Sequence, residues 1–567
     1  MKLSEIVAQI YDRIEAGPLH PVWISLVPRQ AALARAQELE SSPPGPLLGT
    51  TFAVKDNLDV TGLPTTAGCP AYAYTPARSA PAVQRLQDAG AILIGKTNMD
   101  QFATGLVGTR SPHGSCSSVF DERYISGGSS SGSAVAVARG LVTFALGTDT
   151  AGSGRVPAAF NGIIGLKPTR GLLSTSGVVP ACRSLDCVSI FAANCHEAHR
   201  VWKAARGFDA SDPYSRALRP GDDAAPWLEG PFRFGVPPSA QLQFFGDEEA
   251  QELFAAAVEK VERLRGEKVE IDFSPFRAAA DLLYQGPWVA ERLAAIERFI
   301  REHAAEMNAV VRGIIAGGER YSAVDAFSAQ YKLNELCQAT AKEWARMDVL
   351  VLPTTGTIYT HEQVAADPVG KNTNLGYYTN FVNLMDLAAA AIPAGFRSNG
   401  LPFGISFIGR AFSDEALLHL AHRYFGANQP LLPRAPGCVD LAVVGAHLTG
   451  QPLNWQLTQR GARLKKTCRT ASRYRLYALE GTTPAKPGLI LDTGAQGLGI
   501  EVEVWTMPEG QFGGFLAEIP PPLAIGSITL ESGESVKGFL CEAWAIAGAT
   551  EITRFGGWRA YRTSSKL

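Results

Sequence analysis

Residues 127–170 have the sequence GGSSSGSAVAVARGLVTFALGTDTAGSGRVPAAFNGIIGLKPTR, in which two serine-bearing glycine turns enclose one apolar segment. The glycines of the first turn, GGSSSGS, allow backbone conformations that residues with a Cβ avoid, so a serine can be held there in an unusual orientation. The second turn, DTAGSGR, brings successive backbone N–H groups close to Ser153, as an oxyanion hole requires. Together with Lys55 in TFAVKDNLDV, this pattern indicates a serine hydrolase that works without histidine.

These motifs resemble the amidase signature family, and the similarity extends over residues 45–425. The hallmark of that family is a Lys, Ser, Ser catalytic triad. By position in the motif, Lys55 matches the base and Ser153 the nucleophile. Ser129 matches the bridging serine, which the family carries on a cis peptide, here the bond after Gly128. The resemblance implies an α/β fold, with a large twisted mixed β-sheet between helices.

A serine and a lysine can hydrolyse an amide without a metal or an organic cofactor, and we expect neither here. A serine hydroxyl is a poor nucleophile at neutral pH, and a lysine becomes its base if burial lowers the lysine pKa enough to leave the amine neutral. Ser129 would then relay the proton from Ser153 to Lys55, and the reverse relay would protonate the departing nitrogen. The expected oxyanion-hole donors are the backbone N–H groups of Thr150, Ala151, Gly152 and Ser153.

The neighbours of the first glycine turn disfavour three other interpretations. A flexible linker would not lead directly into the apolar run SAVAVARGLVTFALG, and the Lys-Ser/Thr pair that closes a P-loop is missing. Residues 128–132 formally fit the G-x-S-x-G elbow of α/β-hydrolases. That elbow needs a preceding strand, whereas FDERYIS is short and polar, and no downstream Asp and His pair is evident.

The composition is that of an ordinary soluble protein. The 567 residues carry a formal net charge of −2, which provides no overall attraction for nucleic acid or an anionic membrane. The nine cysteines are scattered without a C-x-x-C pair, which favours a reducing cytoplasm over a disulfide framework or a zinc ribbon. The N-terminal MKLSEIVAQIYDRIEAG has apolar residues at helical spacing and predicts an amphipathic helix, not a signal peptide. No run approaches the roughly 18 to 20 apolar residues of a membrane span.

The chain is expected to form two domains that differ in secondary structure. Residues 1–430 alternate apolar segments such as TFAVKD, AILIGKTN and DVLVLPTT with helical stretches such as APAVQRLQDAG and DEEAQELFAAAVEKVERLRG, which suits an α/β domain on a mixed sheet. Residues 431–439 belong to a segment rich in Pro and Gly, which predicts a linker. Residues 440–567 contain the strand-like runs LAVVGAHL, YRLYALE, PGLILD, GIEVEVWTM, GGFLAEI and SVKGFLCEA, which predict a small, mostly β domain.

This second domain and the motif LYQGPWVAERL resemble one subgroup of the family, the allophanate hydrolases. Members of the subgroup carry a C-terminal domain of γ-glutamyl cyclotransferase-like type, and Ala151 also follows their version of the glycine turn. Tyr284 and Arg292 match the residues with which the subgroup holds the carboxylate of its substrate. An arginine can bind a carboxylate through two parallel hydrogen bonds. The alternative is that Tyr284 packs in a core and Arg292 lies on a solvated helix face.

Two pairs of histidines and one basic run offer weaker signals. His196 and His199, like His419 and His422, are three residues apart, but no cysteine or carboxylate pattern completes a metal site, so we expect none. Residues 460–475 include seven basic residues and no acid. With little aromatic interleaving, this run predicts a solvated basic face or the edge of a pocket for small anions, and not a nucleic-acid site.

His447 is the candidate catalytic residue of the second domain. It follows an apolar run in VVGAHLTGQPLN and precedes a turn, where the end of a strand could present its side chain to a cleft. The resemblance implies that this domain can decarboxylate the first product, N-carboxycarbamate, with His447 as the best candidate and Glu509 as a weaker one. A purely structural or oligomerisation role for the domain stays open.

The resemblance as a whole implies an enzyme that converts allophanate and water to ammonia and N-carboxycarbamate through a Ser153 acyl-enzyme. It further implies a cytoplasmic homodimer that acts after a biotin-dependent urea carboxylase or in the degradation of nitrogen-rich ring compounds. The alternatives are an amidase of other specificity, the amidotransferase subunit of a tRNA-dependent complex, and a scaffold that kept the fold without activity. The C-terminal β domain disfavours the amidotransferase, and the presence of Lys55, Ser129 and Ser153 disfavours the scaffold.

Overall fold

The computed structural model describes residues 2–16, 21–41, 43, 45–218, 230–426, 438–494 and 497–564. The chain divides into two compact units, Met1–Ala435 and Pro436–Leu567. Residues 431–437 of the predicted linker lie outside the described residues, and residues 438 and 439 begin a strand.

The described part of the larger unit is built on one mixed sheet of eleven strands. These are β1 (Trp23–Leu26), β2 (Thr51–Lys55), β3 (Ile92–Thr97), β4 (Phe144–Asp149), β5 (Ile164–Lys167), β6 (Cys187–Ala192), β7 (Phe232–Val236), β8 (Gly266–Glu270), β9 (Val349–Pro353), β10 (Leu387–Phe396) and β11 (Pro402–Arg410). Their order is β1-β3-β2-β4-β6-β5-β10-β11-β9-β7-β8. β2 runs parallel to both β3 and β4, and β7 runs parallel to both β8 and β9, whereas the other neighbours are antiparallel.

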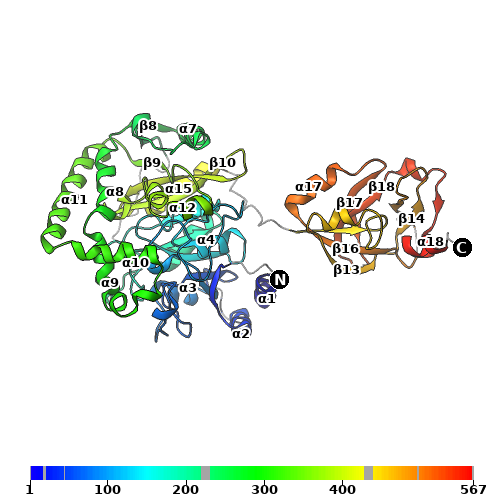
Figure 1. Ribbon diagram of the computed structural model, residues 1–567, viewed down its shortest axis with the longest axis horizontal. Helices are drawn as coiled ribbons and strands as arrows, with labels where there is room; N and C mark the ends of the chain where they lie inside the picture. Colours follow the sequence, from blue (N-terminus) through cyan, green and yellow to red (C-terminus); the bar gives the residue numbers. More distant parts are fainter. Residues whose placement is uncertain are drawn as a thin grey trace. The chain divides into compact units, whose positions relative to one another are not determined.

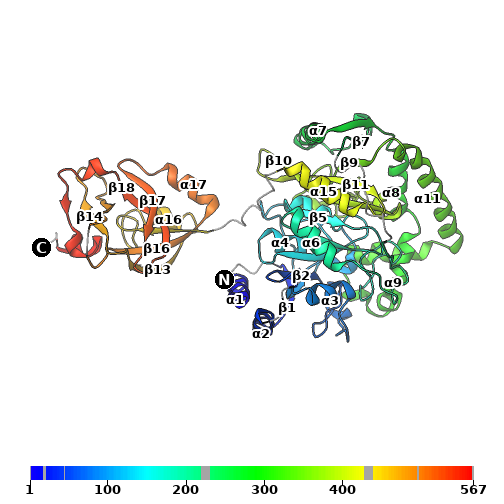
Figure 2. The same cartoon turned by 180° about the vertical axis from the view of Figure 1, so that it is seen from behind.

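Helices cover both faces of this sheet (Figure 1 and, from behind, Figure 2). The α-helices are α1 (Leu3–Ala16), α2 (Arg29–Glu40), α3 (Pro81–Asp88), α4 (Ser131–Ala138), α5 (Val156–Phe160), α6 (Cys195–Ala205), α7 (Glu248–Arg263), α8 (Ser274–Gln285), α9 (Trp288–His303), α10 (Ala309–Ala316), α11 (Ala323–Trp344), α12 (His361–Ala366), α13 (Gly370–Leu375), α14 (Phe381–Leu384) and α15 (Asp414–Phe425). Short 3-10 helices are η1 (Pro70–Tyr72), η2 (Gln101–Ala103), η4 (Ser239–Gln241), η5 (Ala304–Glu306) and η6 (Gly317–Arg320).

The apolar side chains of the strands separate into cores on opposite sides of the sheet. Helices α3, α6, α7 and α15 share one large core with alternate residues of the strands, such as Phe52 and Val54 of β2. On the other face, α1, α2 and α4 pack with Ala53 in one core, and α8, α11 and α14 form another. Because every residue of β2 is buried, its sequence TFAVK shows no polar alternation, as expected for a strand covered on both faces. The prediction of an α/β domain on a mixed sheet is confirmed.

The smaller unit is mostly β, as its sequence predicts. Its strands are β12 (Cys438–Val443), β13 (Arg463–Arg469), β14 (Tyr474–Ala478), β15 (Pro487–Leu491), β16 (Glu501–Pro508), β17 (Leu523–Thr529), β18 (Ser535–Cys541) and β19 (Thr550–Glu551). They form a sheet of order β13-β16-β12-β18-β17 and a second of order β15-β14-β19. The helices are α16 (Trp455–Thr458), α17 (Glu509–Ala517) and α18 (Trp558–Ser564), with η7 (Ala543–Ile546) and η8 (Thr553–Phe555).

One predicted strand of this unit is wrong. The run GGFLAEI lies largely in helix α17. Its apolar residues continue a pattern from Phe512 through Phe515 and Leu516 to Ile519, spaced i, i+3, i+4 and i+7, which is the period of a helix. Phe515 is buried, and Phe512 and Ile519 pack against the same core, so the helical face is the one that the unit covers.

Among the described helices, none combines the length and the apolar character that crossing a bilayer requires.

Candidate active site

Lys55 and Ser153 lie at one edge of the sheet because the strands before them are parallel. Lys55 is the last residue of β2, and Ser153 lies in the turn between β4 and α5. β2 and β4 are adjacent and parallel, so their carboxyl ends meet at the same edge, where α/β proteins commonly bind ligands. Ser129 comes to this edge from the first glycine turn, just before α4. The structure thus brings together the three residues that the sequence separates by up to 98 positions, 153 − 55.

A continuous chain of hydrogen bonds joins the three side chains. Lys55 Nζ donates to Ser129 Oγ at 2.7 Å, and Ser129 Oγ donates to Ser153 Oγ at 2.9 Å. Lys55 Nζ also donates to Thr148 Oγ1 at 2.8 Å. Lys55 and Ser129 are fully buried, and Ser153 is 3 % exposed. The Gly128–Ser129 peptide is cis. When the amine is neutral and the two hydroxyl hydrogens turn toward it, the same chain can pass a proton from Ser153 through Ser129 to Lys55 Nζ.

The glycines of the two turns are needed because other groups occupy the space of a side chain. A Cβ on Gly128 would lie 2.2 Å from Asp100 Oδ2. Gly152 has a φ of +139°, and a Cβ there would lie 2.5 Å from Thr379 Oγ1. Any larger residue would therefore force the turns apart, and both serines with them.

A buried ion pair fastens the second turn. Arg155 binds Asp149 with its Nε and Nη2, both at 2.9 Å, and neither side chain is exposed. The carboxylate of Asp149 also accepts the N–H groups of Gly152 at 3.0 Å and Gly154 at 2.9 Å. The N–H of Gly152 is thus engaged in this arrangement. Among the described residues, no acceptor is bonded to the other expected oxyanion-hole donors, the N–H groups of Thr150, Ala151 and Ser153.

The surroundings of Lys55 favour its neutral form. Burial lowers the pKa of Lys55 from 10.5 to about 7, and the positive charge of Arg292 acts in the same direction. Three buried carboxylates oppose the shift, those of Asp100, Asp186 and Asp149. A lysine amine with this pKa is largely unprotonated just above neutral pH, which is the state that a general base requires.

Arg292 is a buried guanidinium without a carboxylate partner among the described residues. Its side chain, on α9, is 2 % exposed. Nη1 donates to Thr104 Oγ1 at 3.2 Å and Nη2 to the hydroxyl of Tyr284 at 3.4 Å, while Nε has no hydrogen-bond partner in the described chain. Arg292 therefore does not lie on a solvated helix face. A buried cation without a counter-ion is costly, so the arrangement is suited to an anionic ligand.

Arg292 and Ser153 contact neighbouring residues of the chain, Thr104 and Gly105. Arg292 contacts Thr104, and the carbonyl oxygen of the next residue, Gly105, accepts a long hydrogen bond of 3.5 Å from Ser153 Oγ. A ligand that reaches both groups must therefore be short. The half-buried Tyr284 lies beside the guanidinium, whose central carbon is 5.2 Å from the centre of its ring.

A second candidate site lies in the smaller unit, around His447. This half-buried residue borders a cavity of about 150 Å³ that Lys486 and Phe539 also line. His447 Nε2 is 2.8 Å from Gln456 Oε1, and its ring stacks on Phe539. Burial lowers the pKa of His447, and Lys486 lowers it further, although the bond to Gln456 opposes the shift. The side chain of Glu509 lies outside the described residues.

The basic run of the smaller unit is largely neutralised by acids from elsewhere in the chain. Lys465 binds Asp440 at 2.6 Å. Further ion pairs join Arg460 to Glu518, Lys466 to Glu534, and Arg475 to Asp492 and Glu551. Lys486 lies outside this run and has no ion-pair partner among the described residues, which leaves it as a cation facing the His447 cavity.

Four residues contribute to the two sites although they were not predicted as site residues. Asp149 and Arg155 flank the second glycine turn, and their opposite charges six residues apart were a signal that could have been used. Thr148 directly precedes the second glycine turn, but its bond to Lys55 depends on the pairing of β4 with β2, and Lys486 joins the His447 cavity only through the packing of separate segments.

Comparisons with known proteins agree with this division of the chain. A family model described as Amidase matches residues 5–418, and a model described as Allophanate hydrolase C-terminal domain matches residues 439–563. A solved structure of Kluyveromyces lactis allophanate hydrolase is 43% identical to this chain; the match covers 100% of this chain and 97% of that chain, with a TM-score of 0.73.

The similar proteins include urea amidolyases and subunits of glutamyl-tRNA(Gln) amidotransferase. The chain is 44% identical over 595 residues to urea amidolyase of Saccharomyces cerevisiae, covering 98% of this chain and 32% of that protein. It is 32% identical over 472 residues to a subunit of glutamyl-tRNA(Gln) amidotransferase from an Azoarcus species, covering 76% of this chain and 95% of that protein. The chain spans about a third of the length of the urea amidolyases that it matches.

Proposed function

Since the chain belongs to the amidase family and is an amidohydrolase, we propose that its substrate is allophanate, which it converts to ammonia and N-carboxycarbamate. The observation that carries the proposal is Arg292, a buried guanidinium without a carboxylate partner in the described chain, held close to the Lys55, Ser129 and Ser153 hydrogen-bond chain. Allophanate is a small urea derivative with one anionic end. The similarity to proteins named allophanate hydrolase and urea amidolyase supports the same substrate.

In the first half of the reaction Ser153 Oγ attacks the terminal carbonyl carbon of allophanate. Its proton moves to Ser129, and the Ser129 proton moves to the neutral amine of Lys55, along the bonds of 2.9 and 2.7 Å. The negative charge that develops on the carbonyl oxygen is stabilised by N–H groups of the second glycine turn. The same relay in reverse protonates the amide nitrogen, which leaves as ammonia, and the acyl group remains on Ser153.

Water completes the reaction by attack on the acyl-enzyme. Lys55, neutral again, takes a proton from the water through Ser129, and Ser153 regains its hydroxyl hydrogen when the ester bond breaks. Arg292 and Tyr284 hold the carboxylate through both halves, so that the reacting carbon stays in front of Ser153. Binding energy from the anionic end of the substrate thus contributes to orientation at the reacting end.

The smaller unit is proposed to act on the product. N-carboxycarbamate carries two carboxylates, and the cavity beside His447 offers the cation of Lys486 to hold one of them. Loss of carbon dioxide leaves an electron pair on nitrogen, and a proton supplied through His447 converts it to carbamate, which breaks down to ammonia and carbon dioxide. A structural role for this unit is the competing proposal.

The amidotransferase alternative is less well supported. The match to the subunit of glutamyl-tRNA(Gln) amidotransferase covers 76% of this chain, whereas residues 439–563 match the allophanate hydrolase C-terminal domain. We further propose that the enzyme acts in the cytoplasm and receives allophanate from a urea carboxylase. The eight described cysteines are free thiols, which supports a reducing compartment.

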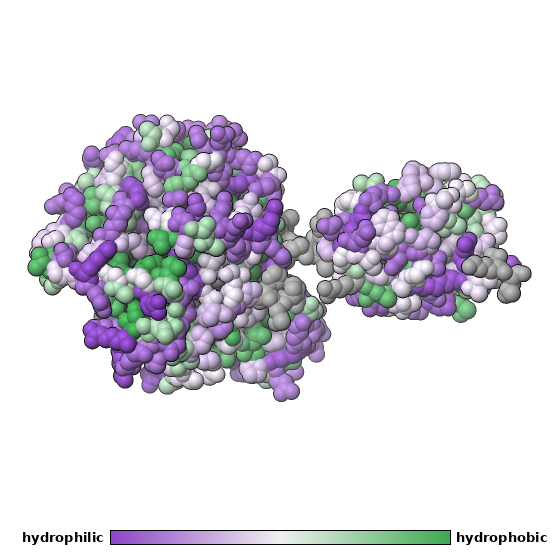
Figure 3. Space-filling model, viewed as in Figure 1, coloured by the Kyte–Doolittle hydropathy of each residue, from purple (hydrophilic) through white to green (hydrophobic). Residues whose placement is uncertain are grey.

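We also propose that the chain forms a homodimer through α11. Val324, Phe327 and Tyr331 follow one another at helical spacing on this helix and are 73 %, 63 % and 64 % exposed. Figure 3 shows hydrophobic residues at the surface edge where Figure 1 places α11. Light scattering after size exclusion should give twice the chain mass for the wild type and the chain mass for Phe327→Glu. Gln330→Glu, which adds the same charge elsewhere on α11, should remain a dimer, and a wild-type monomer would contradict the proposal.

The experiment that tests the substrate compares ammonia release from allophanate with release from urea, acetamide, malonamate and glutamine. We expect the largest kcat/KM for allophanate. Malonamate has the same anionic end and a neighbouring amide, so it should be the next best. A preference for a neutral amide or for glutamine would contradict the proposal.

A further inference from the structure

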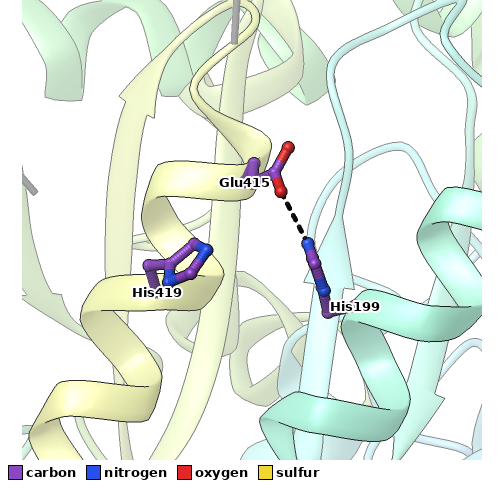
Figure 4. Close-up of side chains that lie close together, drawn as sticks. All are labelled: His199, Glu415 and His419. Carbon is purple, nitrogen blue, oxygen red and sulfur yellow. Dashed lines mark hydrogen bonds and ion pairs between the residues drawn. The ribbon is translucent and has the colours of Figure 1, made fainter. Parts of the chain in front are cut away.

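Two pairs of histidines that lie more than 200 residues apart in the sequence meet on the surface of the larger unit. Helix α6 contributes His199, and helix α15 contributes Glu415 and His419. In Figure 4 these three side chains point toward one another across the space between the two helices. Both helices bury their apolar residues in one core, with Ala198 and Trp202 of α6 and Leu417 and Leu418 of α15 among them. The shared core fixes the spacing between the helices.

The three polar groups are close enough to serve one ion. One nitrogen from each histidine and one oxygen from Glu415 all lie within 4.8 Å of one another. Around a zinc ion with bonds of about 2.0 to 2.2 Å, ligand atoms are separated by roughly 3.3 to 3.5 Å, so small side-chain rotations would complete the site. His199 Nε2 is now hydrogen-bonded to Glu415 Oε1 at 2.8 Å. Binding of a metal would replace this bond and release its proton.

The cavity beside the cluster is lined by further side chains whose nitrogen or sulfur atoms can bind a metal. A cavity of about 150 Å³ is lined by His199 and His419 together with His196, His422 and Cys195. Imidazole and carboxylate donors favour zinc and its neighbours in the first transition series, whereas magnesium and calcium favour oxygen donors alone. Within the described part of the chain, the one lysine or arginine paired with the cluster is Lys203, whose Nζ lies 3.1 Å from Glu415 Oε1 and whose side chain is 49% exposed. A side chain that exposed can turn into solvent.

We propose that His199, Glu415 and His419 form a binding site for a divalent zinc-class metal ion that links α6 to α15. None of the three belongs to the Lys55, Ser129 and Ser153 site, and two of them come from one helix at positions i and i+4. The ion would join two helices that otherwise meet through their shared apolar core and the contacts around Glu415. Its role is to stabilise the covering layer of the sheet, and hydrolysis does not require it.

The test uses full-length, tag-free protein from which metal has been removed with a chelator. Isothermal titration with Zn²⁺ should show one site per chain, and Co²⁺ should produce visible absorption bands of a tetrahedral or five-coordinate complex. Zn²⁺ should also raise Tm by a few degrees, because a ligand that binds only the folded state stabilises it. Ammonia release from allophanate should be the same with and without the metal.

Variants decide whether these residues are the ligands. His419→Ala and Glu415→Gln should each weaken Zn²⁺ binding by at least about tenfold and abolish the Tm shift. Lys203→Met should strengthen it, because a competing cation is removed. The matched control is His303→Ala, a histidine on α9 with Glu306 3.9 Å away and outside the His199 cluster, which should bind as the wild type does.

Two results would overturn the proposal. One is the absence of Zn²⁺ and Co²⁺ binding to folded wild-type protein. The other is equal binding by the wild type, His419→Ala and Glu415→Gln. His419 is exposed, so its replacement should leave the fold intact, which circular dichroism checks. Because the readout is metal binding, a failure here would leave the assignment of allophanate as substrate untouched.

Discussion

The Ser153 site and the His447 cavity use two different ways of building a reactive group. Around Ser153 the groups are almost completely buried, and short hydrogen bonds connect them from Lys55 to the nucleophile. Around His447 the imidazole bonds to Gln456, its one polar side-chain partner among the described residues, and its ring packs against those of Phe539 and Phe515. At the Ser153 site the backbone of the glycine turns holds the reactive side chains in position, whereas at the His447 cavity the packing of aromatic rings holds the imidazole.

This difference has an energetic consequence. The glycines of this site leave no room for a Cβ, so replacing one of them, or a member of the Lys55, Ser129 and Ser153 hydrogen-bond chain, should have a large effect. A ring held by aromatic contacts and one hydrogen bond tolerates replacement of its neighbours better. The proposed reactions also differ in difficulty, because amide hydrolysis needs a nucleophile, whereas N-carboxycarbamate can lose carbon dioxide unaided.

The largest expected effect is on the nucleophile. Ser153→Ala should lower kcat for ammonia release by about 10⁴-fold or more, because covalent catalysis is lost while the fold remains. Lys55→Met should lose nearly as much, since it removes the base. Ser131→Ala is the control in the first glycine turn, where the hydroxyl donates to the carbonyl of Asn98 at 3.3 Å, and it should keep most of the activity. Appreciable turnover by folded Ser153→Ala would refute the role of Ser153.

The next effect separates binding of the anion from chemistry. Arg292→Met nearly keeps the length of the side chain and removes its charge. The enzyme should lose about 2 to 5 kcal/mol of transition-state stabilisation, so kcat/KM for allophanate should fall roughly 30-fold to several thousand-fold. Acetamide, which has no carboxylate, should lose much less. Arg298→Met on the same helix changes an exposed arginine paired with Glu302 and should leave both substrates unaffected. Equal losses on the two substrates would make Arg292 a structural residue.

A smaller and continuous effect is expected from pH. Since the lowered pKa of Lys55 is about 7 and the neutral amine is the active form, kcat/KM should rise about tenfold per pH unit below 7 and level off above it. Stopped assays of ammonia between pH 5.5 and 9 would measure this profile, with protein stability checked at each pH. A profile that falls as pH rises through 7 would mean that the protonated amine is required.

From the sequence one could predict that Lys55, Ser129 and Ser153 lie together, but not that His199 lies beside His419, and the reason is physical. Lys55, Ser129 and Ser153 belong to contiguous motifs that end strands or form tight turns, so their local backbone largely sets where they point. The cluster of His199 and His419 depends on how α6 packs against α15, and no local pattern contains that information. The wrong prediction of a strand at GGFLAEI has another cause. Its two glycines interrupt the apolar residues of a helical pattern, to which the buried Phe515 belongs.

The smallest expected effect on ammonia release comes from removing the smaller unit. The rate of ammonia release from allophanate should stay the same within about twofold, because the residues proposed to act on allophanate lie in the compact larger unit. A chain ending at Ala435 tests this, and His447→Ala and Lys486→Met test the cavity within the full chain. All three should let N-carboxycarbamate accumulate transiently, as followed by carbon-13 NMR with labelled allophanate, because its decarboxylation then proceeds without assistance. Lys537→Met, which removes another lysine of this unit, should match the wild type. Identical time courses for the wild type, the truncated chain and His447→Ala would remove catalysis from the smaller unit and leave it a structural role.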